Sequence, residues 1–286
     1  DAVRSRGLGD VYKRQTKYSD LFKPALRYII GVGLLLGILQ QVTGINAIYF
    51  YATSIFKQTG IGTDAAFSSG VLLSFTTVIF TLIAIYLVDR MGRRPLLLIG
   101  MTGIAISLLT CAYGFNQAKY KLTNEGISSL NEIDSSKLLI FQDVEYNSDV
   151  KFKNDIKSAI GNQVYAKNEG PILEAAIEMN STLVLLGILG FIACFAFSLG
   201  PIMWVMLSEL FPNKIRGLAI GFIGFVNSFS SWIIQQIFPW ELSNLGSALT
   251  FLIYGIIALI GALLFFKILP ETKGKSLEEI ELEFVK

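Results

Sequence analysis

The sequence predicts an all-α membrane protein built from six transmembrane helices. Apolar side chains make up 52% of the 286 residues and aromatic ones 12%, and the mean hydropathy is +0.56, which is too high for a soluble domain of this length. These side chains gather in six runs, each near the ~20 residues that an α-helix needs to cross a bilayer. Polar segments separate the runs, so we expect the helices to cross back and forth and to form one bundle.

The elements follow one another in a simple order. Residues 1–15 lack apolar periodicity and resemble a translated sequencing-adapter tail, so we interpret them as artefactual and leave them out of the fold prediction. The predicted spans cover roughly residues 28–55, 66–88, 95–115, 181–206, 215–238 and 246–268. Gly200 and Pro201 predict a bend in the fourth span. Residues 270–286 form a tail, in which Ser276 and Glu279 are spaced as a capping box for a short acidic helix.

The charges between the spans predict an orientation. Six crossings place both ends of the bundle on one side of the membrane. The short connections at 89–94 and 213–216 are rich in cations, as is the lead-in before the first span, and short cation-rich loops face the cytoplasm. We therefore expect residues 16–115 and 181–269 to form two sets of three helices whose free ends are cytoplasmic.

A polar insertion at residues 116–180 lies between the third and fourth spans and is expected outside the cytoplasm. Its lysines do not contradict this, because long polar segments cross a membrane largely regardless of charge. It is longer than a compact connection needs, and both a small folded cap and disorder fit its composition. Pro171 suits the first turn of a helix, so we expect the fourth transmembrane helix to begin there, outside the bilayer.

Three amides mark a candidate binding site in the first span. Leaving the side chain of Gln40, Gln41 or Asn46 unpaired away from water would cost a few kcal/mol, so such residues usually line a cavity or a packed interface. On a straight helix Gln41 and Asn46 would point about 140° apart. Gly44 between them predicts a broken helix, the structure in which transporters build midplane sites. Amides that merely bridge neighbouring helices remain the alternative.

Composition excludes several classes of function. The net charge is only +2 and there is no histidine, and basic clusters with interleaved aromatic residues are absent, so nucleic acid is not an expected partner. Cys111 and Cys194 lie far apart inside apolar runs, which gives neither a disulfide framework nor a metal site. No nucleophile and base, phosphate loop or metal cluster is visible in the sequence, so we expect neither an enzyme nor a cofactor.

Four motifs in series resemble the sugar porter family of the major facilitator superfamily, specifically its C-terminal half, helices seven to twelve. They are Gln-Gln-x-x-Gly-x-Asn at 40–46, Asp-Arg-Met-Gly-Arg-Arg at 89–94, Gly-Pro-x-x-Trp at 200–204 followed by Glu209 and Arg216, and Pro-Glu-Thr-Lys-Gly at 270–274. The resemblance implies a twelve-helix transporter of hexoses, pentoses or related polyols, in which this chain pairs with an N-terminal six-helix half and the two halves rock about a central site.

The resemblance also implies roles for individual residues. Gln40, Gln41 and Asn46 would bond sugar hydroxyls, and Tyr51 would belong to the outer gate. Trp204 would stack on the pyranose ring, although a packing or interfacial role is the alternative. Asn227 would add an amide and begins a polar stripe with Ser231 and Gln235, which could instead contact a neighbouring helix. The chain departs from the family at Phe50, often tyrosine, and at Ser228, commonly tryptophan in glucose facilitators.

Charged residues at the predicted cytoplasmic helix ends form a second candidate site. A solvated surface is the simple interpretation. The resemblance instead implies a salt-bridge latch that ties the helix ends together in the outward-open state and breaks on the way inward. The residues concerned are Asp89, Arg90, Arg93, Arg94, Glu209 and Arg216.

These observations together predict transport of a neutral monosaccharide by alternating access, coupled to a proton as a symport. Facilitated diffusion stays open, because the proton carrier is expected in the other half of such proteins. The alternatives are a sugar sensor on the same scaffold that does not transport, and a transporter of another neutral solute such as a cyclitol. We expect a multi-pass protein of a cell membrane, the bacterial inner membrane, whose partners are the lipid bilayer, the sugar and a proton.

Overall fold

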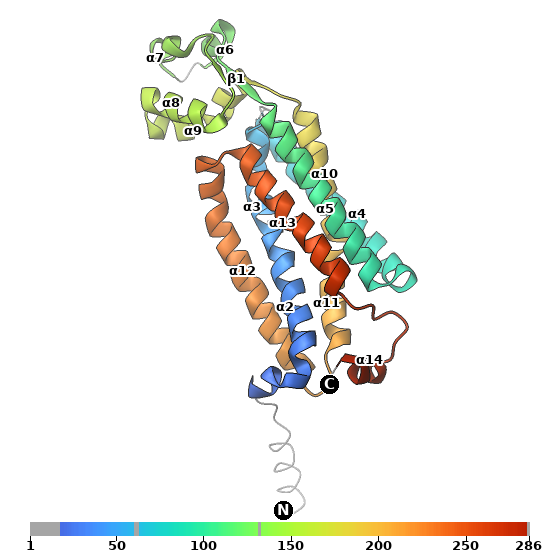
Figure 1. Cartoon of the computed structure of the whole chain (residues 1–286). Helices are drawn as coiled ribbons and strands as arrows, with labels where there is room; N and C mark the ends of the chain where they lie inside the picture. The colour runs from blue at the N-terminus through green and yellow to red at the C-terminus, as the bar shows by residue number, and fades with distance from the viewer. Residues whose placement is uncertain (1–17, 60–62, 131–132, 285–286) are drawn as a thin grey trace, which may run out of the picture.

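The computed structural model describes residues 18–59, 63–130 and 133–284, so the tail at 1–15 lies outside the described residues. It contains six helical segments that are long and apolar enough to cross a membrane, packed side by side in one bundle (Figure 1). The prediction of six spans is confirmed. The segments are Pro24–Lys57, Gly70–Met91, Arg93–Asn116, Ser181–Leu210, Arg216–Asn244 and Ser247–Ile268.

The first span is broken at Gly44, as the sequence predicts. After the 3-10 turns η1 (Tyr18–Phe22) and η2 (Pro24–Leu26), helix α2 covers Arg27–Val42 and helix α3 covers Ile45–Lys57. Gly44 between them has φ 86°, a left-handed conformation that side chains with a Cβ atom disfavour. The Tyr254 ring lies so close that a Cβ atom on Gly44 would sit 3.0 Å from it. Glycine is therefore required here by conformation and by packing.

The fourth span is also broken. Helix α10 (Ser181–Phe197) and helix α11 (Leu199–Leu210) meet at Ser198, whose φ and ψ of −130° and −91° are not helical. Pro201 then falls in the first turn of α11, where its missing N–H is tolerated. The bend predicted from Gly200 and Pro201 is confirmed. The remaining spans are α4 (Thr63–Met91), α5 (Arg93–Asn116), α12 (Arg216–Asn244) and α13 (Ser247–Ile268), and α14 (Leu277–Phe284) follows.

Packing within the bundle leaves apolar faces exposed on several helices, among them α12 and α4. Helix α5 packs against α13 and α10, α2 packs against α12, and α3 packs against α4. The outer face of α12 instead carries Phe225, Phe229 and Trp232, all at least half exposed and stacked on one another. Helix α4 likewise exposes most of its apolar side chains. Such faces suit lipid or another transmembrane segment.

The described residues of the insertion form a small folded cap. Of the two structures that its composition allowed, a cap and disorder, these residues adopt the first. Strands β1 (Lys119–Lys121), β2 (Glu145–Tyr146) and β3 (Ile177–Glu178) form an antiparallel sheet in the order β2-β1-β3. Tyr120, Tyr146 and Phe152 pack in its own core. The helical elements are α6 (Asn124–Ser129), α7 (Ser135–Leu138), η3 (Leu139–Phe141), α8 (Asp149–Ile160) and α9 (Asn162–Ala176).

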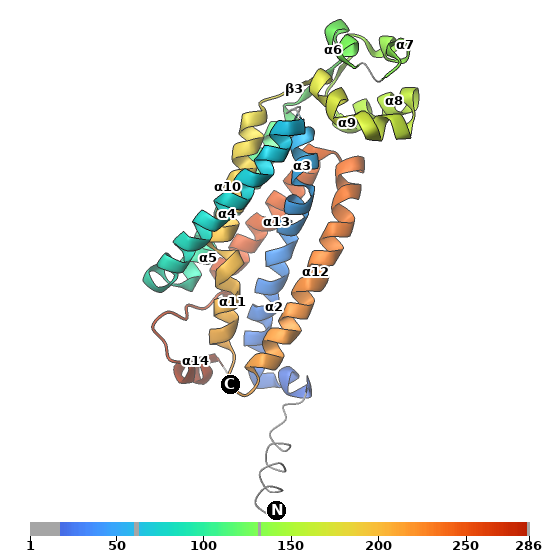
Figure 2. The same ribbon diagram turned by 180° about the vertical axis from the view of Figure 1, so that it is seen from behind.

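The cap sits at one end of the bundle, which we call the insertion end, and α14 and η1 lie at the other, the tail end (Figures 1 and 2). The prediction that Pro171 begins the fourth transmembrane helix is wrong. Pro171 lies inside α9, which stops where β3 pairs with β1. The spanning helix α10 begins only at Ser181, where the Leu183 N–H donates to the Asn180 side chain at 3.0 Å. Helix α9 ends because the chain after it pairs with β1 as strand β3. Local helix propensity does not predict such a pairing between distant segments.

Candidate binding site at the broken helix

The amides singled out in the sequence meet in one hydrogen-bonded cluster, which we call the amide cluster and which comprises Gln40, Gln41, Asn46 and Asn227. Gln41 Nε2 donates to Gln40 Oε1 and to Asn227 Oδ1, each at 3.2 Å. Asn227 Nδ2 donates to Gln40 Oε1 at 2.8 Å. Asn46 Nδ2 donates to Gln41 Oε1, also at 2.8 Å. The break at Gly44 brings Gln41 and Asn46 together, which a straight helix would forbid.

Further bonds tie this cluster to neighbouring helices. Gln40 Nε2 donates to the Leu199 carbonyl at the start of α11 at 2.9 Å, and Asn227 Nδ2 donates to the Gly37 carbonyl of α2 at 2.8 Å. Asn46 Nδ2 reaches Ser231 Oγ of α12 at 2.8 Å, and Gln235 Nε2 donates to the same hydroxyl at 2.9 Å. The polar stripe on α12 therefore faces the amide cluster. Since each buried amide is paired, the cost of its burial is largely offset.

Gln40, Gln41 and Asn46 also line a cavity, so these three amides both bridge helices and border a cavity. Its volume is about 470 Å³, within the range of small-molecule sites. The described lining residues are all uncharged: Gln40, Gln41, Ile45, Asn46, Tyr49, Thr77, Thr81, Ile192, Phe195, Ala196, Gly200 and Pro201. Neutral donors and acceptors on one wall and apolar groups on another match a neutral, hydroxyl-bearing molecule better than an ion.

Three predicted site residues lie outside this lining. Asn227 belongs to the amide cluster but is buried and does not line the cavity. Trp204, on α11, is 43% exposed and lies beside Gly224 of α12. The Tyr51 ring packs on Phe238 with ring centroids 5.7 Å apart, near the insertion end of α3.

Sequence reasoning missed three hydroxyl-bearing residues of the cavity. The Tyr49 hydroxyl forms a hydrogen bond with Thr77 Oγ1 of α4, and Thr81 lies one turn further along α4 and lines the same cavity. Tyr49 follows Asn46 by three residues, which places the two on one helix face. That spacing could have identified Tyr49, whereas the two threonines sit in an apolar run without a signal of their own.

A second cluster, which we call the charge cluster, lies at the tail end. Arg93 Nη2 contacts Glu209 Oε1 at 2.7 Å, and Arg93 Nε donates to both Glu209 oxygens at 3.1 and 3.2 Å. Arg93 also pairs with Asp89 at 3.2 Å, although that carboxylate is 80% exposed. A planar guanidinium on a carboxylate in this geometry forms a strong, directional pair, here between the first residue of α5 and the last turn of α11.

The charge cluster includes residues of the Pro-Glu-Thr-Lys-Gly motif that the sequence analysis did not assign to it. Glu271 accepts from the backbone N–H groups of Arg93 and Arg94, each at 3.1 Å, so it caps the positive end of α5. Thr272 Oγ1 donates to Glu209 Oε2 at 2.7 Å. The signal in the sequence was the adjacent pair Glu271 and Thr272 just after the last span, which could have predicted contacts with the cationic helix ends.

The other three arginines predicted for this cluster bind elsewhere. Arg90 lies over the Tyr86 ring, 4.0 Å from its centroid. Arg94 Nη2 donates to the Phe266 carbonyl at 2.7 Å, and Arg216 Nε donates to the Phe211 carbonyl at 3.1 Å. Among the described residues, the side chains of these three arginines therefore form no ion pair with the cluster's carboxylates.

The comparison with protein families decides the identity of this bundle. A family model described as "Sugar (and other) transporter" matches residues 9–130 and 159–284. The chain belongs to this sugar transporter family. It is a sugar porter of the major facilitator superfamily and spans the membrane several times, and members of the family are transporters rather than enzymes. Residues 131–158 of the insertion lie outside the matched segments.

Individual relatives agree with this family. The chain is 33% identical over 268 residues to the arabinose-proton symporter of Bacillus subtilis (strain 168), covering 94% of this chain and 45% of the relative. It is 29% identical to the D-xylose-proton symporter of Escherichia coli (strain K12), over 88% of this chain and 40% of that protein. The chain spans about half the length of the curated relatives it matches.

A solved structure has the same fold. The proton:xylose symporter XylE bound to 6-bromo-6-deoxy-D-glucose superposes with a TM-score of 0.62 at 29% identity, over 90% of this chain and 42% of XylE. The match covers the C-terminal half of XylE. It supports the order of the six spans deduced from the sequence motifs.

Proposed function

We propose that this chain forms the substrate-binding half of a transporter that moves a neutral monosaccharide, a hexose or a pentose, by alternating access. The observation that carries the proposal is the amide cluster at the Gly44 break, beside an uncharged cavity of about 470 Å³. An amide presents both a donor and an acceptor, so a sugar hydroxyl can replace an amide-to-amide bond without leaving a buried group unpaired.

In this proposal Gln40, Gln41 and Asn46 bind sugar hydroxyls, and Asn227 holds the two glutamines in place. Tyr49 adds a hydroxyl from α3. Trp204 stands on α11 three residues beyond Pro201, which lines the cavity, and its exposed ring covers the C–H face of the sugar when the other half of the transporter closes the site.

Alternating access then uses the two ends of the bundle differently. At the insertion end, α3 swings about Gly44 and carries Tyr51 over the bound sugar. At the tail end, the Arg93 and Glu209 pair holds α5 to α11 and must part before the cavity opens on that side. The two events are exclusive states of one equilibrium, which bound sugar shifts.

Proton-coupled symport is the proposed mode of transport. It is supported by two relatives whose names are arabinose-proton and D-xylose-proton symporter. Uptake into energised vesicles should collapse when an uncoupler removes the proton gradient. Uptake that persists at the same initial rate would instead indicate facilitated diffusion.

We further propose the bacterial inner membrane as the location, with the tail end cytoplasmic and the insertion extracytoplasmic. The cation-rich helix ends at Arg90, Arg93 and Arg94 support this orientation. A protease added to intact spheroplasts should cleave within the insertion and leave the 270–286 tail intact. Cleavage of the tail alone would reverse the orientation.

Binding of a panel of labelled monosaccharides to the intact protein in detergent tests the substrate, with Gln41→Ala as the control. Saturable binding of one sugar that the variant loses would establish substrate and site together. Binding to cyclitols but to no sugar would give the protein another neutral substrate. Binding without uptake in liposomes would make it a sensor.

A further inference from the structure

We propose that Asp149 of the insertion is a positioning residue for the gate helix α3, on which it acts through Ser247 and Gln58. This inference rests on the proposed transport function, since α3 is the helix that closes over the sugar. It concerns a segment outside the matched part of the family, because Asp149 and Lys153 both lie within residues 131–158.

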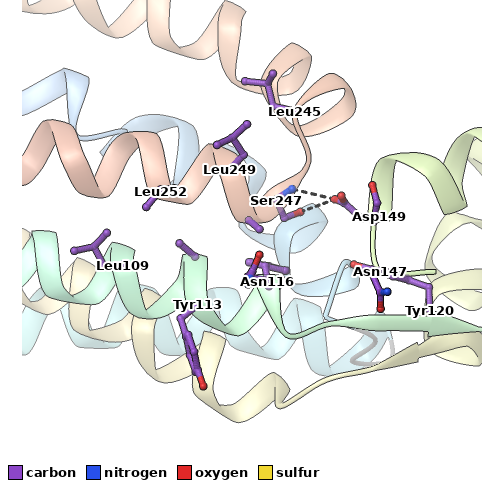
Figure 3. Close-up of a pocket in the computed structure, with 14 residues that line it drawn as sticks. Leu109, Tyr113, Asn116, Tyr120, Asn147, Asp149, Leu245, Ser247, Leu249 and Leu252 are labelled. Carbon is purple, nitrogen blue, oxygen red and sulfur yellow. Dashed lines mark hydrogen bonds between the residues drawn. The ribbon is translucent and has the colours of Figure 1, made fainter. Parts of the chain in front are cut away.

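The Asp149 carboxylate is seated on the first turn of a transmembrane helix. Its Oδ2 accepts from the Ser247 backbone N–H at 2.9 Å and lies 3.3 Å from Ser247 Oγ, as Figure 3 shows. Its Oδ1 accepts from the Val150 N–H at 2.8 Å. A negative charge at this place also complements the positive end of α13.

The fit around this carboxylate is close. Gly246 has φ 84°, and a Cβ atom there would lie 2.3 Å from Asp149 Oδ1, so only glycine admits the carboxylate. Lys153 pairs with Asp149 at 3.6 Å, and the two side chains keep only 6% and 13% exposure. Because a charge buried to this degree is costly without its partner, Lys153 compensates the burial of the Asp149 carboxylate against α13.

Ser247 passes this contact on to α3. Its hydroxyl donates to Oε1 of Gln58, the buried C-cap residue of α3. The next carbonyl, that of Thr59, accepts from Ser181 Oγ at 2.6 Å, where the chain leaves the insertion for α10. The outer end of α3 is thus hydrogen-bonded to α13, whose first turn Asp149 caps, and to α10, which begins where the insertion ends.

The insertion also encloses the outer end of α3. Helix α9 packs against α3, and cavities of about 770 and 210 Å³ flank the contact and share Ser54 of α3 and Glu169 of α9. The smaller one is also lined by the gate residue Tyr51 and by Lys153. Movement of α3 toward the sugar must therefore carry the insertion with it or break the Gln58 and Ser247 contact.

Asp149 acts on a conformational equilibrium rather than on the sugar. The pair between Arg93 and Glu209 is closed in the structure that contains the Asp149 contacts, so both belong to one state. Neutralising Asp149 loosens the cap of α13, releases Gln58 and favours the alternative state. Sugar then binds from the insertion side to a smaller fraction of the molecules.

The test compares variants of the intact transporter in liposomes by uptake kinetics and by hydrogen exchange of the α3 amides. We expect Asp149→Asn to raise KM three- to tenfold with kcat changed by less than twofold. Exchange over residues 45–57 should speed up while that of β1 stays unchanged. Asp143→Asn is the matched control, since Asp143 pairs with Lys121 on the exposed side of the same insertion at 3.1 Å.

A double-mutant cycle separates positioning from a general loss of structure. Gln58→Leu should produce the Asp149→Asn phenotype, and the double variant should be no worse than either single one, because both break one chain of contacts. Additive effects, or an unchanged KM and exchange rate in Asp149→Asn, would overturn the inference. If the wild type transports no monosaccharide, the proposed function fails, whereas the exchange data still report whether Asp149 holds α3.

Discussion

The amide cluster and the charge cluster both join helices that are distant in the sequence, yet they are built on different physics. The amide cluster is neutral, lies beside the Gly44 break and contains groups that donate and accept alike. The charge cluster lies at helix ends and depends on one guanidinium, that of Arg93, and on the carboxylates of Asp89, Glu209 and Glu271. Amides exchange partners at little cost, whereas an ion pair is either closed or broken. The first arrangement suits binding and the second suits switching between two states.

The largest effect is expected from opening the charge cluster, because that would leave one member of a largely buried ion pair without its partner. Losing one partner of a fully buried pair costs about 3–5 kcal/mol. Since Arg93 and Glu209 keep 13% and 22% exposure, we expect about 2 kcal/mol, roughly thirtyfold in the conformational equilibrium. Arg93→Ala and Glu209→Gln should therefore lower the rate of turnover. The sugar Kd, measured in detergent where sugar reaches the site in either state, should stay within about twofold.

Arg94→Ala serves as the control for this prediction, since in the part of the chain that the structure describes the Arg94 side chain donates to a backbone carbonyl and to no carboxylate. Initial uptake rates and equilibrium binding are measured on the same preparations. Lost binding together with intact exchange in Arg93→Ala would contradict the division between a binding cluster and a switching cluster.

A smaller effect, in binding instead of turnover, is expected at the amide cluster. Gln41→Ala removes the donor to Asn227 Oδ1 and the acceptor for Asn46 Nδ2 and should weaken sugar binding at least tenfold, about 1.4 kcal/mol. Gln235→Ala is the matched amide control, because among the described residues the Gln235 side chain bonds only to Ser231 on its own helix. This variant should change Kd less than threefold. Isothermal titration of the two variants distinguishes them, and equal affinities would end the assignment of this site.

Trp204 offers a way to sharpen the comparison, since it belongs to neither hydrogen-bonded cluster. If its ring covers the sugar, Trp204→Ala should weaken binding about tenfold and Trp204→Phe should recover part of that loss. Trp232→Ala is the control, because Trp232 is exposed to a similar degree on α12 and stacks on Phe229. Wild-type affinity in Trp204→Ala would leave the tryptophan a packing or interfacial role.

The smallest effect is expected from an ion pair on the exposed surface of the insertion. Lys119 lies 2.7 Å from Glu145, and its hydrogen bond and charge hold the pKa of Glu145 below the ordinary value. Because the folded-state pKa is lowered, the ionised carboxylate stabilises the folded protein at pH values above the unfolded pKa of about 4.3. This stabilisation is lost as the pH falls through the folded-state pKa. Between pH 5 and 3, wild type should lose slightly more thermal stability than Glu145→Gln. An identical pH dependence in both would show that this pair contributes nothing.

The sequence alone determined the membrane helices and the residues of the amide cluster. Apolar runs near ~20 residues specify spans because lipid admits little else, and Gly44 between two sets of amides indicated a break because a straight helix would separate Gln41 from Asn46. A glycine between amides in an apolar run is a local signal, which can be recognised without knowing what packs against it.

Only the tertiary structure decided which partners those residues meet. Glu271 joined the charge cluster because the tail returns to the start of α5, and Thr77 faced Tyr49 because α4 packs on α3. Pro171 ended up inside a helix since pairing of β3 with β1 set the helix boundary. Asp149 contacts Ser247 in the first turn of α13, although the two residues are 98 positions apart in the sequence. Contacts of such long range depend on how the helices and the insertion pack together, and no pattern of spacing along the chain encodes that packing.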